Sequence, residues 1–304
     1  MAKNVLVLLI GGSGSGQTDP FQLLQQEAAR TEAATAGVTA EIVFASGFEQ
    51  LSIIRRRLRD ASAPPLDAVI VEPVSIGSTG LILKDLKDAT GCVLLNAWSP
   101  EVEEYARRWG KGLPFGTVST DHVRIGQIQG RQINALLPTG GAVLCVTGPQ
   151  RSSAALERLE GMKAMLGRDL TYYETEAGEW NEADGIAAFE HWYALYKPRT
   201  FNVDVIAAQS DDLAMGVRAA CQAVQNAAHR EMLRRARLLG VDACPAFGRK
   251  LVDSGRLTAS VTTPANTGEA IRFLCRFWNS GVPLPLRAFT APQAYPVSSA
   301  PPSQ

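Results

Sequence analysis

The sequence has no excess of either charge sign, since 30 Lys and Arg residues are balanced by 30 Asp and Glu residues over 304 positions. Proteins that bind nucleic acids usually carry an excess of Lys and Arg to neutralise phosphates. We therefore expect no nucleic-acid partner. Long apolar runs are also missing, because the VLVLLI segment at residues 5–10 is far shorter than the roughly 20 residues of a membrane-spanning helix. We expect a soluble chain with no direct insertion into a membrane.

Cysteine and histidine are scarce and scattered. None of the five cysteines forms a CxxC pair, which excludes a zinc knuckle or a thioredoxin-type site. Each cysteine adjoins an apolar run and is expected to be a small buried hydrophobe. The three histidines form no HExxH motif, and no GxSxG motif is present. We expect these histidines to be packed or surface residues, and we predict no catalytic residue, metal site or cofactor. The histidines are His122, His191 and His229.

Apolar runs of about four to seven residues alternate with stretches of helical spacing, which is typical of buried parallel strands covered by helices. Asp19-Pro20 is a helix start signal, with Asp as the N-cap and Pro at the first helical position, and Gly37 is the expected end of that helix. The predicted strands are 5–10, 41–45, 68–71, 92–95, 117–119, 142–147, 170–174, 205–208, 236–241 and 259–262. The predicted helices are 21–36, 50–60, 78–89, 125–137, 153–166, 182–196, 213–227 and 245–254.

This alternation predicts an α/β fold with two similar, doubly wound parallel-sheet lobes that follow the same strand order. No linker rich in Pro, Gly and Ser separates the halves, so we expect ordered crossing strands between them. The expected lobes are residues 1–118 with 264–290 and residues 119–263 with 291–304. Residues 283–304 are predicted to be an extended return crossing followed by a tail. A ligand cleft between the lobes is the expected functional site.

The segment Gly11–Thr18 after the first strand nearly matches the phosphate-binding motif GxxxxGK[ST], but Gln17 stands where the motif requires Lys. A neutral amide cannot supply the positive charge that holds the phosphates. The helix start at Asp19 also comes later than in such a loop and would place a negative charge beside a phosphate. A degenerate nucleotide-binding enzyme that depends on magnesium is therefore the alternative interpretation.

Asp211 and Asp212 form a carboxylate pair directly after the apolar run VIAA. Such a pair at a strand end can serve a metal or acid/base site. Adjacent residues in a loop usually point apart, and an Asp in this position commonly caps the following helix. We expect one of the two to be a helix cap.

Several strings in the second half occur in an ordered set. They are VSTD at 118–121, GPQRSSAA at 148–155, AQSDDLAMG at 208–216, GVD at 240–242 and GRLTASV at 255–261. In this order and spacing they resemble the type I periplasmic binding protein superfamily, in particular the sugar-binding branch of ABC transporter solute-binding proteins, which includes ribose-binding proteins and the effector domains of lac-repressor-type regulators. The resemblance spans residues 4 to about 297 and implies two α/β lobes that close on a solute.

The resemblance implies ligand contacts in the first lobe at two places. The Asp-Pro-Phe-Gln stretch after the first strand matches an Asn-Pro-Phe segment of the family, so Asp19 and Gln22 would hydrogen-bond sugar hydroxyls and Phe21 would offer an aromatic face. Asn96 falls where the family places an Asp or Asn. The Arg that often follows is missing here, and Trp98 is nearby instead.

The second lobe departs from the family pattern at one ligand-binding position, because Leu156 stands where the family usually has an Arg that binds the ligand. The resemblance therefore implies that Gln150, Arg151 or Arg158 supplies the ligand contact that the missing Arg would make. Of the other implied contacts, Trp180 would stack on the ligand and Asp242 matches the Asp of a Gly-Phe-Asp motif. Ser210 replaces an Asn, and Thr263 replaces a late Gln.

The resemblance implies non-catalytic binding of a monosaccharide or polyol, read by a membrane permease or a sensor kinase. It places the protein in the periplasm or cell envelope. Because only four residues precede the first predicted strand, we expect neither a signal peptide nor a helix-turn-helix in the sequence as given. A cytoplasmic sensor domain is therefore the second alternative.

Overall fold

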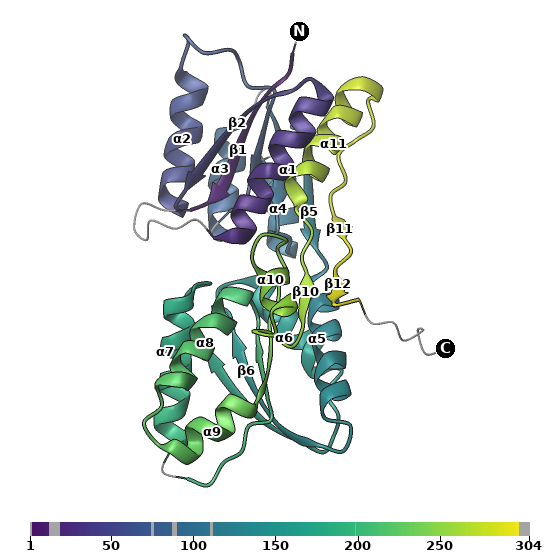
Figure 1. Ribbon diagram of the computed structural model, residues 1–304. Helices are drawn as coiled ribbons and strands as arrows, with labels where there is room; N and C mark the ends of the chain where they lie inside the picture. Colours follow the sequence, from purple (N-terminus) through teal and green to yellow (C-terminus); the bar gives the residue numbers. More distant parts are fainter. Residues whose placement is uncertain are drawn as a thin grey trace, which may run out of the picture. The chain divides into compact units, whose positions relative to one another are not determined.

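The computed structural model describes residues 2–11, 19–73, 76–86, 90–109, 112–197 and 199–297. The chain forms two compact units, the first comprising Met1–Thr120 with Ala265–Thr290 and the second Asp121–Pro264 with Ala291–Gln304. Each unit is an α/β layer structure (Figure 1). The α/β fold with parallel sheets in two units, predicted from the alternation of apolar runs, is confirmed.

The first unit contains a six-stranded sheet in which each strand pairs in parallel with its neighbours. In sheet order the strands are β11 (Ala288–Thr290), β5 (Phe115–Thr120), β4 (Gly91–Leu95), β3 (Ala68–Val71), β1 (Asn4–Ile10) and β2 (Thr39–Ala45). The covering helices are α1 (Pro20–Ala36), α2 (Gly47–Arg59), α3 (Ile76–Asp85), α4 (Pro100–Trp109) and α11 (Asn266–Ser280).

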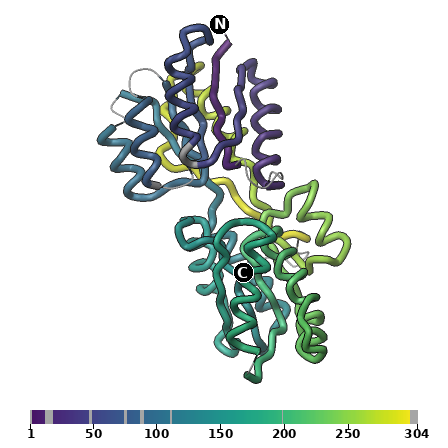
Figure 2. The backbone as a smooth tube through the Cα atoms, turned by 90° about the vertical axis from the view of Figure 1, so that its left-hand side faces the viewer, coloured from purple at the N-terminus to yellow at the C-terminus, as the bar shows by residue number. Residues whose placement is uncertain are grey.

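Strand β1 shows how this sheet is buried on both faces. Val5, Val7 and Leu9 pack with residues of α1 and α11 on one face, whereas Leu6 and Leu8 pack with residues of α2, α3 and α4 on the other. Helices therefore lie on both sides of the strands, as Figure 2 shows from a second direction. A continuous apolar run is what a strand buried on both faces requires.

The second unit contains a four-stranded parallel sheet with helices on both faces, and a separate antiparallel pair of strands. In sheet order the strands are β7 (Leu170–Glu176), β6 (Gly141–Thr147), β8 (Val205–Ala208) and β9 (Arg237–Leu239), and the antiparallel pair is β10 (Ser260–Thr262) with β12 (Gln293–Tyr295). The helices are α5 (His122–Leu136), α6 (Ser153–Lys163), α7 (Glu182–Tyr196), α8 (Asp211–Ala223), α9 (Ala227–Arg235) and α10 (Gly248–Asp253).

The two sheets follow the same order through their first four strands, with the second strand outermost, then the first, the third and the fourth. This confirms the predicted doubly wound repeat. In such a sheet the polypeptide segments that leave the carboxyl ends of the strands meet along one edge, where ligands bind in α/β proteins. Each unit therefore has one edge on which functional side chains are expected.

The start and end signals of α1 act as predicted. The Asp19 side chain accepts a hydrogen bond from the Phe21 amide, Pro20 is the first helical residue, and Gly37 ends the helix in a left-handed conformation with φ of 66°. Glycine adopts this conformation without the steric cost that a side chain brings.

Several predicted elements are wrong in detail. The stretch 213–227 is not one helix as expected. Helix α8 ends at Ala223, and a separate helix, α9, starts at Ala227 because the Asn226 side chain caps its amino end. Helices α4 and α11 were not predicted. The short strands β11 and β12 agree with the prediction of an extended segment after residue 283, and the predicted tail at 298–304 lies outside the described residues. Among the described residues, no helix combines the length and the apolar character that a bilayer crossing demands.

Candidate functional site

A buried carboxylate, Glu72, gathers polar side chains at the edge of the first unit where its strands end. Glu72 directly follows β3, and its side chain accepts hydrogen bonds from Gln22 Nε2 and Asn96 Nδ2, each at 2.9 Å. Its backbone carbonyl accepts a third bond, of 2.8 Å, from Gln50 Nε2. Two of the predicted ligand residues, Gln22 and Asn96, are thus brought together on one carboxylate.

The network continues from Asn96 across the neighbouring strand ends. Asn96 follows β4 in a left-handed conformation with φ of 51°, and its Oδ1 atom accepts a 2.7 Å bond from Asn266 Nδ2 at the start of α11. Asn266 Oδ1 in turn accepts a 2.7 Å bond from the Thr290 hydroxyl. Side chains at the ends of β3, β4 and β11 therefore form one continuous hydrogen-bonded row.

Two buried amide oxygens in this first-unit network, Gln22 Oε1 and Gln50 Oε1, have no hydrogen-bond partner among the residues that the structure describes. Both amides use their nitrogen on Glu72, which leaves the oxygens as acceptors. Buried polar groups are nearly always hydrogen-bonded in native proteins. A group that donates hydrogen bonds, such as a water or a solute hydroxyl, would satisfy them.

The remaining first-unit predictions, Asp19, Phe21 and Trp98, are held by other contacts. Asp19 caps α1, and Phe21 is half-buried. The Trp98 indole donates to Glu103 Oε1 at 3.1 Å, and the Arg287 guanidinium covers its ring at 3.4 Å from the centroid. One ring face of Trp98 is therefore occupied by a side chain of its own unit.

In the second unit the corresponding polar centre is Arg158, which is only 6% exposed. Its Nη1 atom donates to the Gln209 carbonyl at 2.5 Å, and its Nε atom faces His122 Nδ1 at 3.4 Å. Its Nη2 atom lies 3.7 Å from Asp242 Oδ1. The Trp180 ring is stacked over the guanidinium, with 5.3 Å between Cζ and the ring centroid. Arg158 therefore connects Asp242 and Trp180, both predicted ligand residues.

Asp242 is held in a strained position by backbone hydrogen bonds. Its φ is 102°, a region that non-glycine residues rarely occupy and that is common at functional sites. The Asp242 amide donates to the Val261 carbonyl at 2.8 Å, and the Asp242 carbonyl accepts from the Thr263 amide at 3.1 Å. Burial raises the pKa of Asp242, while the Arg158 charge acts in the opposite direction.

The Trp180 ring also packs directly on the backbone at Gly148. A Cβ atom at that position would lie 2.1 Å from Trp180 Cη2, so no other residue fits beneath the ring. Gly148 itself is fixed because its amide donates to Gln209 Oε1 at 3.0 Å. Trp180 is thus positioned beside Arg158 by a glycine at the end of β6.

Ser210 acts as the N-cap of α8, because its hydroxyl accepts from the Leu213 amide at 3.1 Å. The expectation that Asp211 or Asp212 caps this helix is therefore wrong, since Ser210 comes first in the chain and leaves both carboxylates within the first turn. Burial raises the pKa of Asp212 to about 7. The predicted ligand residue Thr263 is buried, and its side chain hydrogen-bonds the Asp242 carboxylate.

Gln150 and Arg151 lie on an exposed loop after β6. The Gln150 amide donates to Glu176 Oε1 at 2.9 Å, and the Arg151 side chain bonds Gly178 and Glu179. The bonds of these two residues thus join the loop after β6 to the end of β7 and the loop that follows it.

Sequence reasoning missed Glu72, Asn266, His122 and Gln209. A signal existed for Glu72, since an acidic residue followed by Pro directly after the buried run AVIV marks a strand end. Nothing in the local pattern distinguishes His122 from an ordinary packed residue. Its role depends on contact with Arg158, 36 positions away in the chain.

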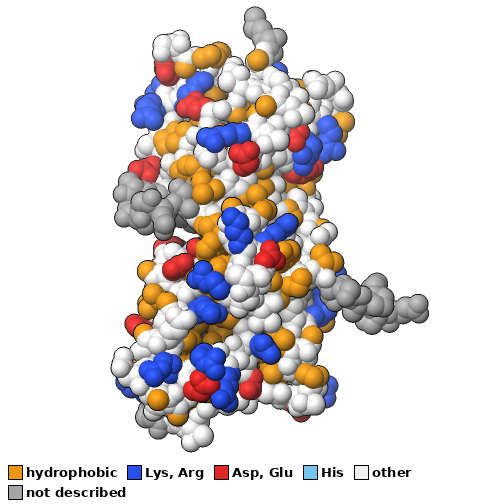
Figure 3. Space-filling view, viewed as in Figure 1, with side chains coloured by type: hydrophobic (Ala, Val, Ile, Leu, Met, Phe, Trp, Pro, Cys, Tyr) orange, Lys and Arg blue, Asp and Glu red, His pale blue; other side chains and the backbone are white. Residues whose placement is uncertain are grey.

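Residues 12–18 of the glycine segment Gly11–Thr18 lie outside the described residues. Within the described part of the chain, no group of three or more His, Cys, Asp or Glu side chains is placed to hold a metal ion. Acidic and basic side chains are interspersed over the face shown in Figure 3.

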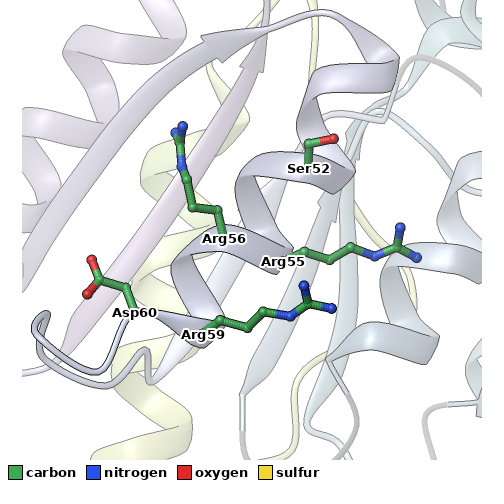
Figure 4. A pocket seen from close by; sticks show the side chains of 5 residues that line it. All are labelled: Ser52, Arg55, Arg56, Arg59 and Asp60. Atoms are coloured by element: carbon green, nitrogen blue, oxygen red, sulfur yellow. The ribbon is translucent and has the colours of Figure 1, made fainter.

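A surface hollow of about 540 Å³ lies along α2 in the first unit (Figure 4) and includes arginines of the basic stretch 55–59. Arg55 is paired with Asp85 at 2.7 Å, and the nearby Arg57 is paired with Glu41 at 3.0 Å. Because α2 starts after the carboxyl end of β2 and runs back along the sheet, its last turn lies away from the strand ends that carry Glu72 (Figure 1). The hollow is thus a feature separate from the two polar centres. Its lining residues are Ser52, Arg55, Arg56, Arg59 and Asp60.

Comparisons with known proteins identify the family to which the chain belongs. The chain is 22% identical over 262 residues to the ribose import binding protein RbsB of Escherichia coli (strain K12), covering 86% of this chain and 79% of that protein. An ABC transporter solute-binding protein from Bacillus halodurans C-125 with bound myo-inositol matches with a TM-score of 0.74 and 20% identity, covering 96% of this chain and 93% of that one. A periplasmic solute-binding protein from Actinobacillus succinogenes 130z with bound D-allose matches with a TM-score of 0.75 and 16% identity, covering 97% of both chains. The model of the periplasmic binding protein domain family matches residues 10–271, and the chain belongs to that family.

Proposed function

We propose that this protein binds a small polyhydroxylated solute, a monosaccharide or a polyol, reversibly and without catalysis. The observation that carries the proposal is the buried Arg158–Asp242 pair beside the Trp180 ring at the strand ends of the second unit. A guanidinium offers only donors and a carboxylate only acceptors, whereas a sugar hydroxyl both donates and accepts. An aromatic ring provides an apolar surface for the C–H face of a sugar.

The first unit supports the same chemistry with a different set of groups. Its network of Gln22, Glu72, Asn96 and Asn266 consists of amides and one carboxylate. Its two buried amide oxygens, which find no partner in the described part of the chain, favour a ligand that donates hydrogen bonds.

The proposed role is delivery of the solute to a membrane permease for ABC-type uptake, or to a sensor kinase. Both the ribose import protein and the two solute-binding proteins described above carry names that refer to import or ABC transport. We propose the periplasm or cell envelope as the location. The protein is proposed to act as a binding protein rather than an enzyme.

The experiment is titration calorimetry, supported by thermal unfolding, with D-ribose, D-allose, myo-inositol and ATP with magnesium. A solute that binds only the folded state adds about 2.7 kcal/mol at a hundredfold excess over Kd, which raises Tm by roughly 4 °C in a protein of this size. Asp242→Asn should weaken binding of the sugar or polyol by about 10-fold to 100-fold, because a bond to a charged group is lost.

The matched control is Asp169→Asn, the same chemical change at an exposed residue. It should leave the affinity unchanged. Binding of ATP with magnesium, without binding of any sugar or polyol, would overturn the proposal and make the glycine segment Gly11–Thr18 the functional site.

A further inference from the structure

His122 is a buried histidine at the polar centre of the second unit. It is the first residue of α5, it follows the N-cap Asp121, and it is 4% exposed. Its Nδ1 atom faces Arg158 Nε at 3.4 Å, and its Nε2 atom is buried without any hydrogen-bond partner among the described residues. Arg158 is the residue that also reaches Asp242.

The contact with Arg158 determines which ring nitrogen carries the proton. A guanidinium has donors only, so His122 Nδ1 must face it with a lone pair. In a neutral imidazole the hydrogen is then on Nε2. Burial and the Arg158 charge both hold the pKa of His122 well below its usual range, which keeps the ring neutral. The group without a partner is therefore an N–H donor.

A buried donor without an acceptor is costly, so native proteins rarely keep one. The neighbouring chemistry indicates what acceptor is missing. The Asp242 carboxylate, which the Thr263 side chain hydrogen-bonds and which lies 3.7 Å from Arg158 Nη2, is an acceptor at the same centre. The centre around Arg158 thus presents the His122 N–H as a donor and the Asp242 carboxylate as an acceptor, a pair that a hydroxyl-bearing solute can satisfy.

We propose that His122 is a specificity-determining residue whose Nε2–H donates to one hydroxyl oxygen of the bound solute. The inference rests on the proposed function and goes further, because it assigns one ligand oxygen to one ring nitrogen. The protein then selects a solute that carries an oxygen at this position. An analogue that has hydrogen there leaves the His122 N–H unsatisfied and is discriminated against.

Two conservative variants separate the ring nitrogens. In His122→Asn, the side-chain oxygen can take the place of Nδ1 as acceptor for Arg158, while the donor at the Nε2 position is removed. In His122→Gln, the amide nitrogen can take the place of Nε2–H, while the acceptor for Arg158 is removed. His122→Asn thus retains the acceptor for Arg158, whereas His122→Gln retains the donor to the ligand.

The experiment measures Kd by calorimetry for D-ribose, D-allose and myo-inositol, and then for the monodeoxy analogues of the tightest binder. In wild type, we expect one deoxy analogue to bind about tenfold more weakly or worse. For the same analogue, the ratio of its Kd to the Kd of the parent solute should fall below about twofold in His122→Asn. In His122→Gln this ratio should stay as in wild type. A purely structural role of His122 would change all affinities together and leave this ratio unmoved.

A second measurement uses the wild-type protein and does not depend on the folding of any variant. With ¹⁵N-labelled histidine, the His122 ring should appear as the Nε2–H form, and its Nε2 signal should shift on addition of the tightest binder. An unchanged Nε2 signal at saturation, or an equal deoxy ratio in wild type and His122→Asn, overturns the inference while leaving the proposed function intact. Failure of wild type to bind any of these solutes overturns both.

Discussion

Asp211 is predicted to be a main determinant of stability in the second unit. It is 1% exposed, and its carboxylate accepts hydrogen bonds from the Ser260 hydroxyl at 2.7 Å and the Ala243 amide at 2.8 Å. It thereby connects the start of α8 to β10 and to the segment after β9. The carboxylate sits against two glycines, because a Cβ at Gly240 or Gly248 would lie 2.1 or 1.8 Å from its oxygens.

The magnitude follows from the donors that a substitution leaves unpaired. Asp211→Ala removes the acceptor of two buried donors, each of which costs about 1–3 kcal/mol when unsatisfied. We expect a loss of about 4 kcal/mol in the free energy of unfolding. Asp211→Asn keeps the shape and one acceptor oxygen, so its cost should be about half as large.

The cost of Asp211→Asn should also depend on pH. Burial, together with the nearby Asp242 charge, raises the pKa of Asp211 well above its usual range. Between about pH 4 and that raised pKa, the folded wild type binds more protons than the unfolded chain, so its stability falls as the pH rises. The asparagine variant has no such group. Its disadvantage should therefore be largest near pH 5 and shrink toward pH 8.

The assay is urea unfolding at pH 5 and pH 8, followed by circular dichroism and by tryptophan fluorescence, to which Trp180 and Trp192 of the second unit contribute. Asp169→Asn, at an exposed position, serves as a control and should change stability by less than about 0.5 kcal/mol. A cost of Asp211→Ala below about 1 kcal/mol, or an Asp211→Asn cost that grows with pH, would refute the reasoning.

Two further predictions concern packing and thiol chemistry. Gly161→Ala should destabilise the protein by more than about 2 kcal/mol in urea unfolding, because its Cβ would lie 2.0 Å from the Val123 carbonyl oxygen where α6 meets α5; a loss below 0.5 kcal/mol would contradict this close approach. In native protein at pH 8, a thiol reagent should modify the partly exposed Cys275 first. Three buried thiols, whose pKa burial raises to about 12, should react slowly with the same reagent. Labelling of any of these three thiols faster than Cys275 would contradict this prediction. The three thiols are those of Cys92, Cys145 and Cys221.

Local signals were sufficient for most of the strands and for helices with explicit caps. The strands 68–71 and 205–208 and the helix 182–196 have the predicted bounds. A signal for α4 was present but not used, since Ser99 precedes Pro100 and its hydroxyl accepts from the Val102 amide. Helix α11 was missed although its apolar residues have helical spacing. It is fixed by packing of Ile271 and Leu274 against strands that lie far away in the sequence.

The candidate site was predictable only in part. The resemblance named Arg158, Trp180 and Asp242, and the structure brings these three together. It named Gln22 and Asn96 but not Glu72, the carboxylate that joins them. Glu72 belongs to a strand end between theirs in the chain, and only the parallel sheet places the three ends side by side.

The sequence by itself determined the alternation of strands and helices, because buried strands require unbroken apolar runs and helix ends require particular capping residues. It also determined the chemical kinds of side chain available at the strand ends. Only the tertiary structure decided which of them meet. The contact between His122 and Arg158, and the bonds from Asp211 to Ala243 and Ser260, join residues 32 to 49 positions apart. Protonation state and hydrogen-bond satisfaction depend on such neighbours in space, which no local pattern records.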